Sequence, residues 1–317
     1  MTTITPQSTA FPSLTVHREE SGPFAGIATL VLEQPGSPVV VLDEALIRRI
    51  ETALKGLPRG LTGFILASAS SRVFIAGADL KTIQANPGNP DDDRRLDAYL
   101  AYGQRVFGMI ADLPCPTAAA IGGAALGGGL EIAMHCDALI GAPNASGKPY
   151  SVGLPETGLS ICPGWGGTNL LPARMDPVEA IRRTMTGKPM MFDEAVAAKV
   201  FDRVATSDAE LLTTAKQWIV DARGKMGQPG GIARRDGAPS RWIGRANVRA
   251  SVQAAIATIG AEPITGEPAK AVVDAVRVGL EQGWQGALEL ERRELTRLRN
   301  TPAGKAAIQA FFDKAKK

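Results

Sequence analysis

Two glycine-rich segments, each with a glutamate beside it, place the strongest constraint on what this chain can fold into. The first runs from Gly127 to Glu131, and the second runs from Gly153 to Thr168 with Glu156 inside it. Glycine lets a backbone approach a ligand closely, so free N–H groups can point into a cavity. A third segment, Phe74 to Lys81, stands at the end of an apolar run. Together the three segments predict an oxyanion hole built from main-chain amides, with glutamates as acid and base.

Each of these signals has a plainer interpretation when taken alone. Glu131 falls in the first turn of a predicted helix, where a carboxylate is favourable because it faces the positive end of the helix. Glu156 follows a proline in a loop, and a loop glutamate is usually solvated. The glycines at 127–129 lack the Lys-Ser/Thr of a phosphate-binding loop and could form a simple turn. The order in which the three segments occur together is what favours a catalytic site.

Short apolar runs alternate with helical periodicity over the first two hundred residues. The runs 14–16 and 26–32 flank a Gly-Pro pair and predict a hairpin, and Asp43 is a plausible N-cap of the helix that follows. The runs 61–67, 117–121 and 138–140 also predict strands, with helices between them. Strands that alternate with helices favour an α/β fold with parallel strands.

Beyond about residue 200 the pattern becomes helical. A long helix is predicted over 268–299, although the glycines at 279, 283 and 286 weaken its middle, and the polar stretch 224–240 stands before it. We therefore divide the chain into a catalytic core, residues 1–205, and a C-terminal helical region, residues 206–317.

Composition argues against several other classes of protein. The net charge is only +3 and Lys and Arg are scattered, so no nucleic-acid footprint stands out. Three cysteines fit neither a disulfide framework nor a zinc site, which indicates a reducing compartment and hence the cytoplasm. The two histidines lack the spacing of metal ligands. The N-terminal stretch through Pro12 has no signal-peptide core and the longest apolar run, 117–130, is too short for a bilayer, so we expect no membrane contact.

The three segments resemble the signature blocks of the crotonase superfamily, which includes the enoyl-CoA hydratases. They are Phe74 to Lys81, Ala125 to Glu131, and Gly153 to Glu156 with Pro163 to Thr168. The final segment, Glu267 to Phe312, is similar to the hydratase half and linker helix of multifunctional fatty-acid oxidation proteins. No dinucleotide-binding glycine fingerprint follows it in this sequence, so we expect no dehydrogenase half. The resemblance implies a spiral of ββα units with an appended helical region.

The resemblance also implies a role for each matching residue. The amides of Ala78 and Gly128 would form the oxyanion hole for the thioester carbonyl of an acyl-CoA. Glu131 would be the base that activates water and Glu156 the acid that protonates Cα, with the N–H of Gly164 supporting the water or Glu156. Coenzyme A would contact the segment formed by Ala76, Asp79, Leu80 and Lys81. Lys81 is the candidate for the phosphates, because no Lys or Arg stands just before the first helix.

The implied reaction is the syn hydration of trans-2-enoyl-CoA to 3-hydroxyacyl-CoA, with no metal or other cofactor because coenzyme A is carried by the substrate. Two alternatives stay open. One is the Δ3,Δ2-enoyl-CoA isomerase reaction, which needs a proton carrier at Glu156 and often lacks the other glutamate. The other is a non-catalytic relative that binds CoA or RNA. Relatives of this kind imply a homotrimer or hexamer, with a separate 3-hydroxyacyl-CoA dehydrogenase as a further partner in the pathway.

Overall fold

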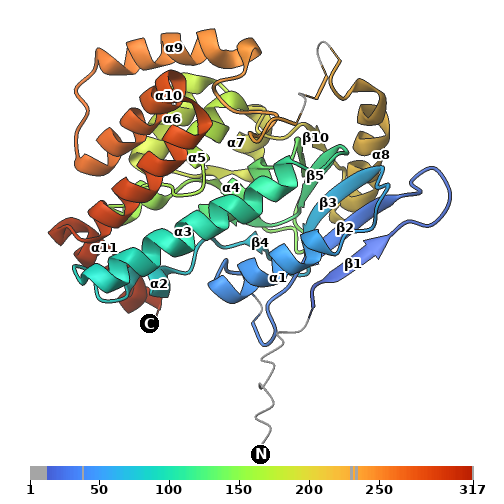
Figure 1. Ribbon diagram of the computed structural model, residues 1–317, viewed down its shortest axis with the longest axis horizontal. Coiled ribbons are helices and arrows are strands. Elements are labelled where there is room, and N and C mark those ends of the chain that lie inside the picture. The colour runs from blue at the N-terminus through green and yellow to red at the C-terminus, as the bar shows by residue number, and fades with distance from the viewer. Residues whose placement is uncertain (1–12, 38, 229–230, 233–234, 316–317) are drawn as a thin grey trace, which may run out of the picture.

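A computed structural model describes residues 13–37, 39–228, 231–232 and 235–315, which form two β-sheets surrounded by helices (Figure 1). The larger sheet has six strands in the order β1-β2-β3-β5-β7-β10. β1 and β2 form the antiparallel hairpin expected from the sequence, and the remaining neighbours pair in parallel. The strands are β1 (Thr15–Arg18), β2 (Ile27–Leu32), β3 (Gly63–Ser68), β5 (Thr117–Ile121), β7 (Ala138–Gly141) and β10 (Arg203–Val204).

The smaller sheet positions the candidate site. Its four strands lie in the order β4 (Val73–Ile75), β6 (Ala124–Leu126), β8 (Ser151–Gly153) and β9 (Met190–Met191), and the first three are parallel. The carboxyl ends of parallel strands meet at the same edge of a sheet. Since β4 leads into 76–81, β6 into 127–131 and β8 into Glu156, the three glycine-associated segments of the sequence are brought to one edge.

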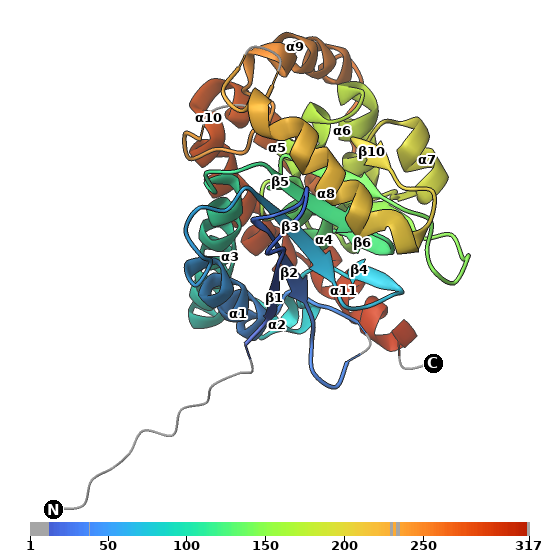
Figure 2. The same cartoon turned by 90° about the vertical axis from the view of Figure 1, so that its right-hand side faces the viewer.

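Helices cover the sheets on both faces. α1 (Glu44–Lys55) begins after Asp43, whose carboxylate accepts the amide of Leu46 at 2.7 Å as the sequence predicts. α3 (Pro90–Ala111) packs beside α1, whereas α8 (Leu211–Ala222) lies across the opposite face (Figure 2). Residues of α8 such as Ile219 share a separate buried cluster with Ile65 of β3 and Ala118 of β5. The remaining short helices are α2 (Leu80–Gln84), α4 (Gly128–Met134), α5 (Gly167–Leu170), α6 (Pro177–Thr186) and α7 (Phe192–Ala197), with 3-10 turns η1 (Glu156–Leu159), η2 (Leu171–Ala173), η3 (Asp208–Glu210) and η4 (Arg223–Lys225).

The C-terminal helices fold back over the rest of the molecule. They are α9 (Ala246–Gly260), α10 (Glu267–Arg299) and α11 (Pro302–Ala315). α10 contacts α3, α5 and α6, and α11 contacts α2 and η1. Within α10, Gly283 has φ 84 and ψ −174, so two helical stretches meet there at a break. The glycine-weakened helix that the sequence predicts is therefore present, with its interruption at the second of the three glycines.

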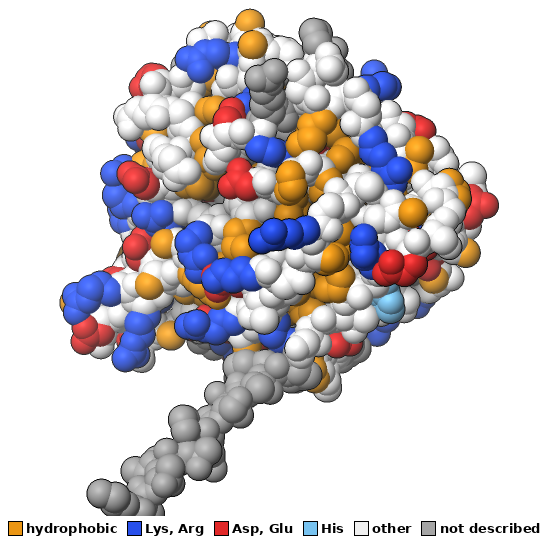
Figure 3. Space-filling model, turned by 45° about the vertical axis from the view of Figure 1, so that its right-hand side comes forward, with side chains coloured by type: hydrophobic (Ala, Val, Ile, Leu, Met, Phe, Trp, Pro, Cys, Tyr) orange, Lys and Arg blue, Asp and Glu red, His pale blue; other side chains and the backbone are white. Residues whose placement is uncertain are grey.

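The α/β fold class with a C-terminal helical region is confirmed. The division at residue 205 stays a prediction. In the part of the chain that the structure describes, no helix is both long and apolar enough to cross a bilayer. On the face shown in Figure 3, Lys and Arg side chains are interspersed with hydrophobic and acidic ones.

Candidate active site

The amides of Ala78 and Gly128 lie next to each other. Leu42 binds the residues on either side of Ala78, donating to the Gly77 carbonyl at 2.9 Å and accepting the Asp79 amide at 3.3 Å. In such a parallel bridge, the N–H of the residue between points away from its neighbour. A Cβ built on Gly128 would stand 3.3 Å from the amide nitrogen of Ala78. Neither amide donates a hydrogen bond to another described residue, so both are free to bind an oxygen.

Glycine is required on both sides of the β6–α4 junction. Gly127 has φ 51, a conformation that side chains other than glycine rarely adopt, and its carbonyl accepts the amides of Leu130 and Glu131 to start α4. Gly128 is the first residue of that helix, where an amide has no acceptor within the helix. A Cβ on Gly128 would lie 2.3 Å from Cζ3 of Trp165. The packing against Trp165 therefore needs glycine at 128, whereas the open amide follows from the position at the start of the helix.

Glu131 is held by the loop that follows η1. Its side chain is 1% exposed, and its Oε1 accepts the amides of Trp165 and Gly167, each at 2.8 Å. The sequence nominates the amide of Gly164 for a supporting role near the water or Glu156. The carbonyl of Gly164 accepts from Nε2 of Gln104 at 2.8 Å, and its amide bonds to no other described residue. The amides of Trp165 and Gly167 were missed by the sequence reasoning, and their role for Glu131 is a structural finding.

Glu156 faces the start of α4 from η1. A Cβ on Gly127 would stand 2.7 Å from Oε1 of Glu156, which places this carboxyl beside the two open amides. The residue as a whole is partly exposed, but its Oε2 is buried and has no hydrogen-bond partner among the described residues. Burial raises the pKa of Glu156 to about 8, and the negative charge of Glu291 adds to the rise. A neutral Glu156 at neutral pH can donate a proton.

A third buried carboxyl, Glu291 of α10, was not nominated from the sequence. It is 1% exposed; its Oε2 accepts the amide of Gly166 at 2.5 Å, and its Oε1 accepts the amide of Thr168 at 3.0 Å and the Thr168 hydroxyl at 2.5 Å. Burial raises the pKa of Glu291 to about 7 against these donors.

Burial, followed by the charges of Glu156 and Glu291, raises the pKa of Glu131, while the amides of Gly167 and Trp165 lower it. Three carboxyls this close share protons, so their titration belongs to the set and not to single residues. Such an arrangement can give and take protons near neutral pH, as a site that works by general acid and base chemistry requires.

The residues nominated for coenzyme A lie on either side of Ala78 in the chain. Ala76 and Lys81 are exposed. The carboxylate of Asp79 caps α2, accepting the amides of Lys81 at 3.0 Å and Thr82 at 3.3 Å. Lys81 lines a cavity of about 430 Å³ together with Arg299 and Lys305. Arg299 is committed to Asp93 and to the carbonyls of Ile83 and Ala85, so Lys81 and Lys305 are the exposed cations of this cavity.

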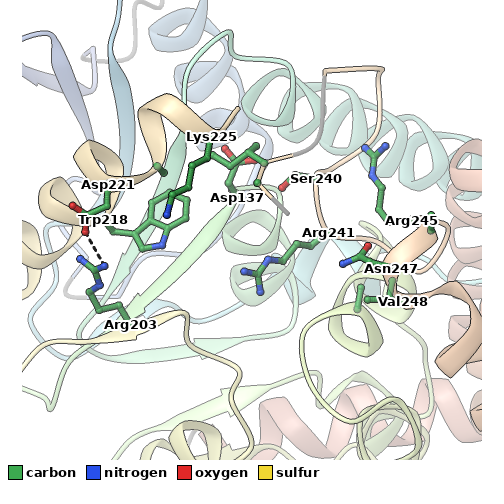
Figure 4. A pocket seen from close by; sticks show the side chains of 15 residues that line it. Asp137, Arg203, Trp218, Asp221, Lys225, Ser240, Arg241, Arg245, Asn247 and Val248 are labelled. Atoms are coloured by element: carbon green, nitrogen blue, oxygen red, sulfur yellow. Dashed lines mark hydrogen bonds and ion pairs between the residues drawn. The ribbon is translucent and has the colours of Figure 1, made fainter. Parts of the chain in front are cut away.

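A cavity of about 690 Å³ opens elsewhere, beside the end of α8 and the start of α9 (Figure 4). Its arginines are already paired, Arg203 with Asp221, Arg241 with Asp202, and Arg245 with Asp236. None of the residues nominated from the sequence lines it. Cavity size therefore does not locate the chemistry in this molecule, whereas free amides and perturbed carboxyls do.

Two further observations bear on what the site can hold. Among the described residues, no group of three His, Cys, Asp or Glu side chains is placed to bind a metal ion. His135 is buried at the end of α4, and burial lowers its pKa to about 4. One of its ring nitrogens lies 3.2 Å from the carbonyl of Trp165, so this histidine supports the loop in its neutral form.

Comparisons with known proteins bear on the family and on the fold. The family model described as enoyl-CoA hydratase/isomerase matches residues 24–225. The fatty acid oxidation complex subunit alpha of Vibrio vulnificus (strain CMCP6) is 30% identical over 291 residues, covering 90% of this chain and 39% of that protein. The corresponding subunit of Idiomarina loihiensis is 29% identical over 293 residues, with the same two shares. The chain thus spans about two fifths of the length of these curated relatives.

Solved structures show the same fold. Human mitochondrial delta3-delta2-enoyl-CoA isomerase superimposes with a TM-score of 0.65 at 20% identity, covering 96% of this chain and 98% of that one. An enoyl-CoA hydratase from Bacillus halodurans gives a TM-score of 0.64 at 19% identity, covering 94% of this chain and 100% of that one.

Proposed function

The chain belongs to the enoyl-CoA hydratase/isomerase family, and we propose that it adds water to trans-2-enoyl thioesters of coenzyme A, giving 3-hydroxyacyl-CoA. The resemblance to the crotonase superfamily and to the hydratase half of fatty-acid oxidation proteins is confirmed. The observation that carries the proposal is the placement of two open amides beside the carboxyl of Glu156, with the buried carboxyl of Glu131 close enough to interact with it electrostatically. Hydration needs one group to activate water and another to protonate Cα, and both glutamates are present.

The thioester oxygen would be bound by the amides of Ala78 and Gly128. Addition of water at Cβ moves negative charge onto this oxygen, and fixed amides stabilise that charge without reorganising. Each such donor contributes about 3 to 4 kcal/mol to lowering the barrier. Because Gly128 begins α4, the positive end of that helix is directed at the same oxygen.

Glu131 is proposed as the base and Glu156 as the acid. Two loop amides stabilise the charged form of Glu131, whereas the buried Oε2 of Glu156 lacks a partner that would stabilise its charge. Glu131 would take a proton from water as the oxygen attacks Cβ, and Glu156 would transfer its proton to Cα. After the product leaves, Glu131 releases its proton to solvent and Glu156 takes up a proton from solvent, which restores both groups.

The cavity beside α2 supports a place for the coenzyme A phosphates. Lys81 and Lys305 are exposed cations on its wall. The backbone from Ala76 to Leu80 would lie along the pantetheine. In the same proposal, the enzyme uses no metal or other cofactor and forms a homotrimer or hexamer in the cytoplasm. A separate 3-hydroxyacyl-CoA dehydrogenase would be its partner in the pathway.

The test is loss of the enoyl absorbance over a ladder of acyl lengths. Wild type should hydrate at least one substrate, and Glu131→Gln and Glu156→Gln should each lower kcat by about 10²- to 10⁴-fold. Glu289→Gln, an exposed glutamate of α10, is the matched control and should retain full activity. Isomerisation of a 3-enoyl-CoA is measured in parallel. Wild type that isomerises without hydrating, and keeps isomerising as Glu131→Gln, would assign the isomerase reaction in place of hydration.

A further inference from the structure

The loop that holds Glu131 is bound from both sides in alternation. Amides 165 and 167 donate to Glu131, whereas amides 166 and 168 donate to Glu291. The loop therefore runs between a carboxyl of α4 and a carboxyl of α10. Moving either carboxyl would turn the peptide planes that bind the other.

Further contacts with α10 fix the same loop. A Cβ on Gly166, whose φ is 100, would lie 2.4 Å from the ring of Trp284. Nδ2 of Asn169 donates to the carbonyl of Ala275 at 3.1 Å. Glu291 is the one contact in this set that carries a charge.

Stability alone does not account for a carboxyl at this position. Glu291 forms no ion pair with any described cation, and an unpaired buried carboxylate costs several kcal/mol. The neighbouring positions on the buried face of α10, Leu288 and Leu295, are apolar. Three hydrogen bonds from the loop offset part of the cost, which ties the charge of Glu291 to the loop.

We propose that Glu291 is a positioning residue that holds the 165–168 loop so that its alternate amides face Glu131. The inference rests on the proposed function. The titratable groups that face Glu291 are Glu131 of α4, Glu156 of η1 and Cys162 of the preceding loop, whose thiol lies 3.7 Å from the Glu291 carbonyl.

The test compares Glu291→Gln with Glu289→Gln, the exposed neighbour on the same helix. In Glu291→Gln, an NH₂ group replaces one carboxylate oxygen and cannot accept the loop amide that bonded to that oxygen. We therefore expect the loop to shift. A misplacement of about 1 Å can lower kcat by about 100-fold, so we expect kcat to fall by about 10- to 100-fold, with KM changed by less than about twofold. Loss of the negative charge moves the pH–rate profile to lower pH. Glu289→Gln should match wild type in kcat, KM and profile.

A second variant keeps the inference testable if Glu291→Gln folds poorly, and a second assay measures proton transfer without hydration. Thr168→Val removes the hydroxyl donor and keeps the shape of the side chain, so Glu291 holds a proton more readily and the profile moves in the same direction by less. The second assay is exchange of the α-protons of butanoyl-CoA into deuterated water, which needs proton transfer but no net hydration. A folded Glu291→Gln or Thr168→Val protein with the wild-type kcat and pH profile would overturn the inference.

The exchange assay also separates this inference from the proposed function. Wild type that exchanges α-protons without hydrating any enoyl-CoA would refute the hydratase proposal, and slower exchange in Glu291→Gln would still support the positioning role. Exchange that is equal in wild type and Glu291→Gln would refute the positioning role whichever reaction wild type performs. Wild type that neither hydrates nor exchanges would overturn both.

Discussion

Replacing Gly128 with alanine tests the packing at the centre of the candidate site. The new Cβ would stand 2.3 Å from Cζ3 and 2.6 Å from Cε3 of Trp165. Carbon atoms in contact lie about 3.5 Å apart or more, so the ring would have to retreat by about 1.2 Å. The indole cannot do so freely, because its Nε1 donates to the Leu100 carbonyl at 3.0 Å and its ring packs edge-on against Tyr99 and Phe107.

Overpacking of this kind costs about 1 to 3 kcal/mol of stability, and displacing one oxyanion donor costs about 10²- to 10³-fold in kcat. We expect Gly128→Ala to show both losses in thermal unfolding and in enoyl-CoA hydration. Gly108→Ala on α3 is the matched control, because a Cβ there meets nothing within 4 Å and should leave activity unchanged. Adding Trp165→Phe to Gly128→Ala removes the ring edge that clashes and should recover part of the lost activity. Wild-type kcat and melting temperature in Gly128→Ala alone would refute the reasoning.

Three other predictions concern titration, an ion pair and the thiols. The pKa values of Glu156 and Glu291 in the folded protein, about 8 and about 7, are raised from 4.5. The stability that these groups contribute is therefore full below about pH 4.5 and is lost as pH rises through 7 to 8. The fall in melting temperature between pH 5.5 and 8.5 should be smaller in Glu291→Gln than in wild type, and equal falls would contradict this. Arg235→Ala should lower the free energy of unfolding in urea by about 3 to 5 kcal/mol, because it leaves the buried carboxylate of Asp137 without its bidentate partner. Arg94→Ala, which removes an exposed ion pair, should change this free energy by less than about 0.5 kcal/mol. Similar losses in the two variants would argue against a large contribution from the buried pair. The native protein should resist iodoacetamide at pH 8, since all three thiols are buried and burial raises the pKa of Cys115 to about 11. The unfolded chain should take up three equivalents of the reagent. Rapid labelling of the native protein would contradict this, because it would show that a thiol is accessible.

Much of the fold follows from local pattern in the sequence. The strand at 117–121 and the capped helix after Asp43 were predictable because apolar spacing and cap chemistry act over a few residues. The amides of Ala78 and Gly128 were nominated through the resemblance of their segments to a known family, and the structure leaves both amides open, but their role as an oxyanion hole stays a proposal. The pairing of β4, β6 and β8 into a second sheet could not be predicted, since each strand is only three residues long and its partners are distant in sequence.

Glu291 illustrates what local pattern leaves out. The signal was present, because this glutamate interrupts an apolar helical stripe that includes Trp284, Leu288 and Leu295. Its meaning depends on which loop the helix meets, and that loop lies about 125 residues earlier, the separation between Glu291 and Gly166. Likewise, the amides that bind Glu131 come from Trp165 and Gly167 because the loop runs between α4 and α10, which the sequence of the loop alone does not indicate.

The break at Gly283 divides α10 into two stretches, and both contact the loop segment. Ala275 of the first stretch accepts from Asn169, and Glu291 of the second accepts from Gly166 and Thr168. A chain shortened before this helix would leave the amides of Gly166 and Thr168 without acceptors and would lose Trp284, whose ring packs against Gly166. A shortened protein that keeps Glu131 and Glu156 would therefore also need α10 to hold the loop that binds Glu131. A minimal version of this fold has to include both segments.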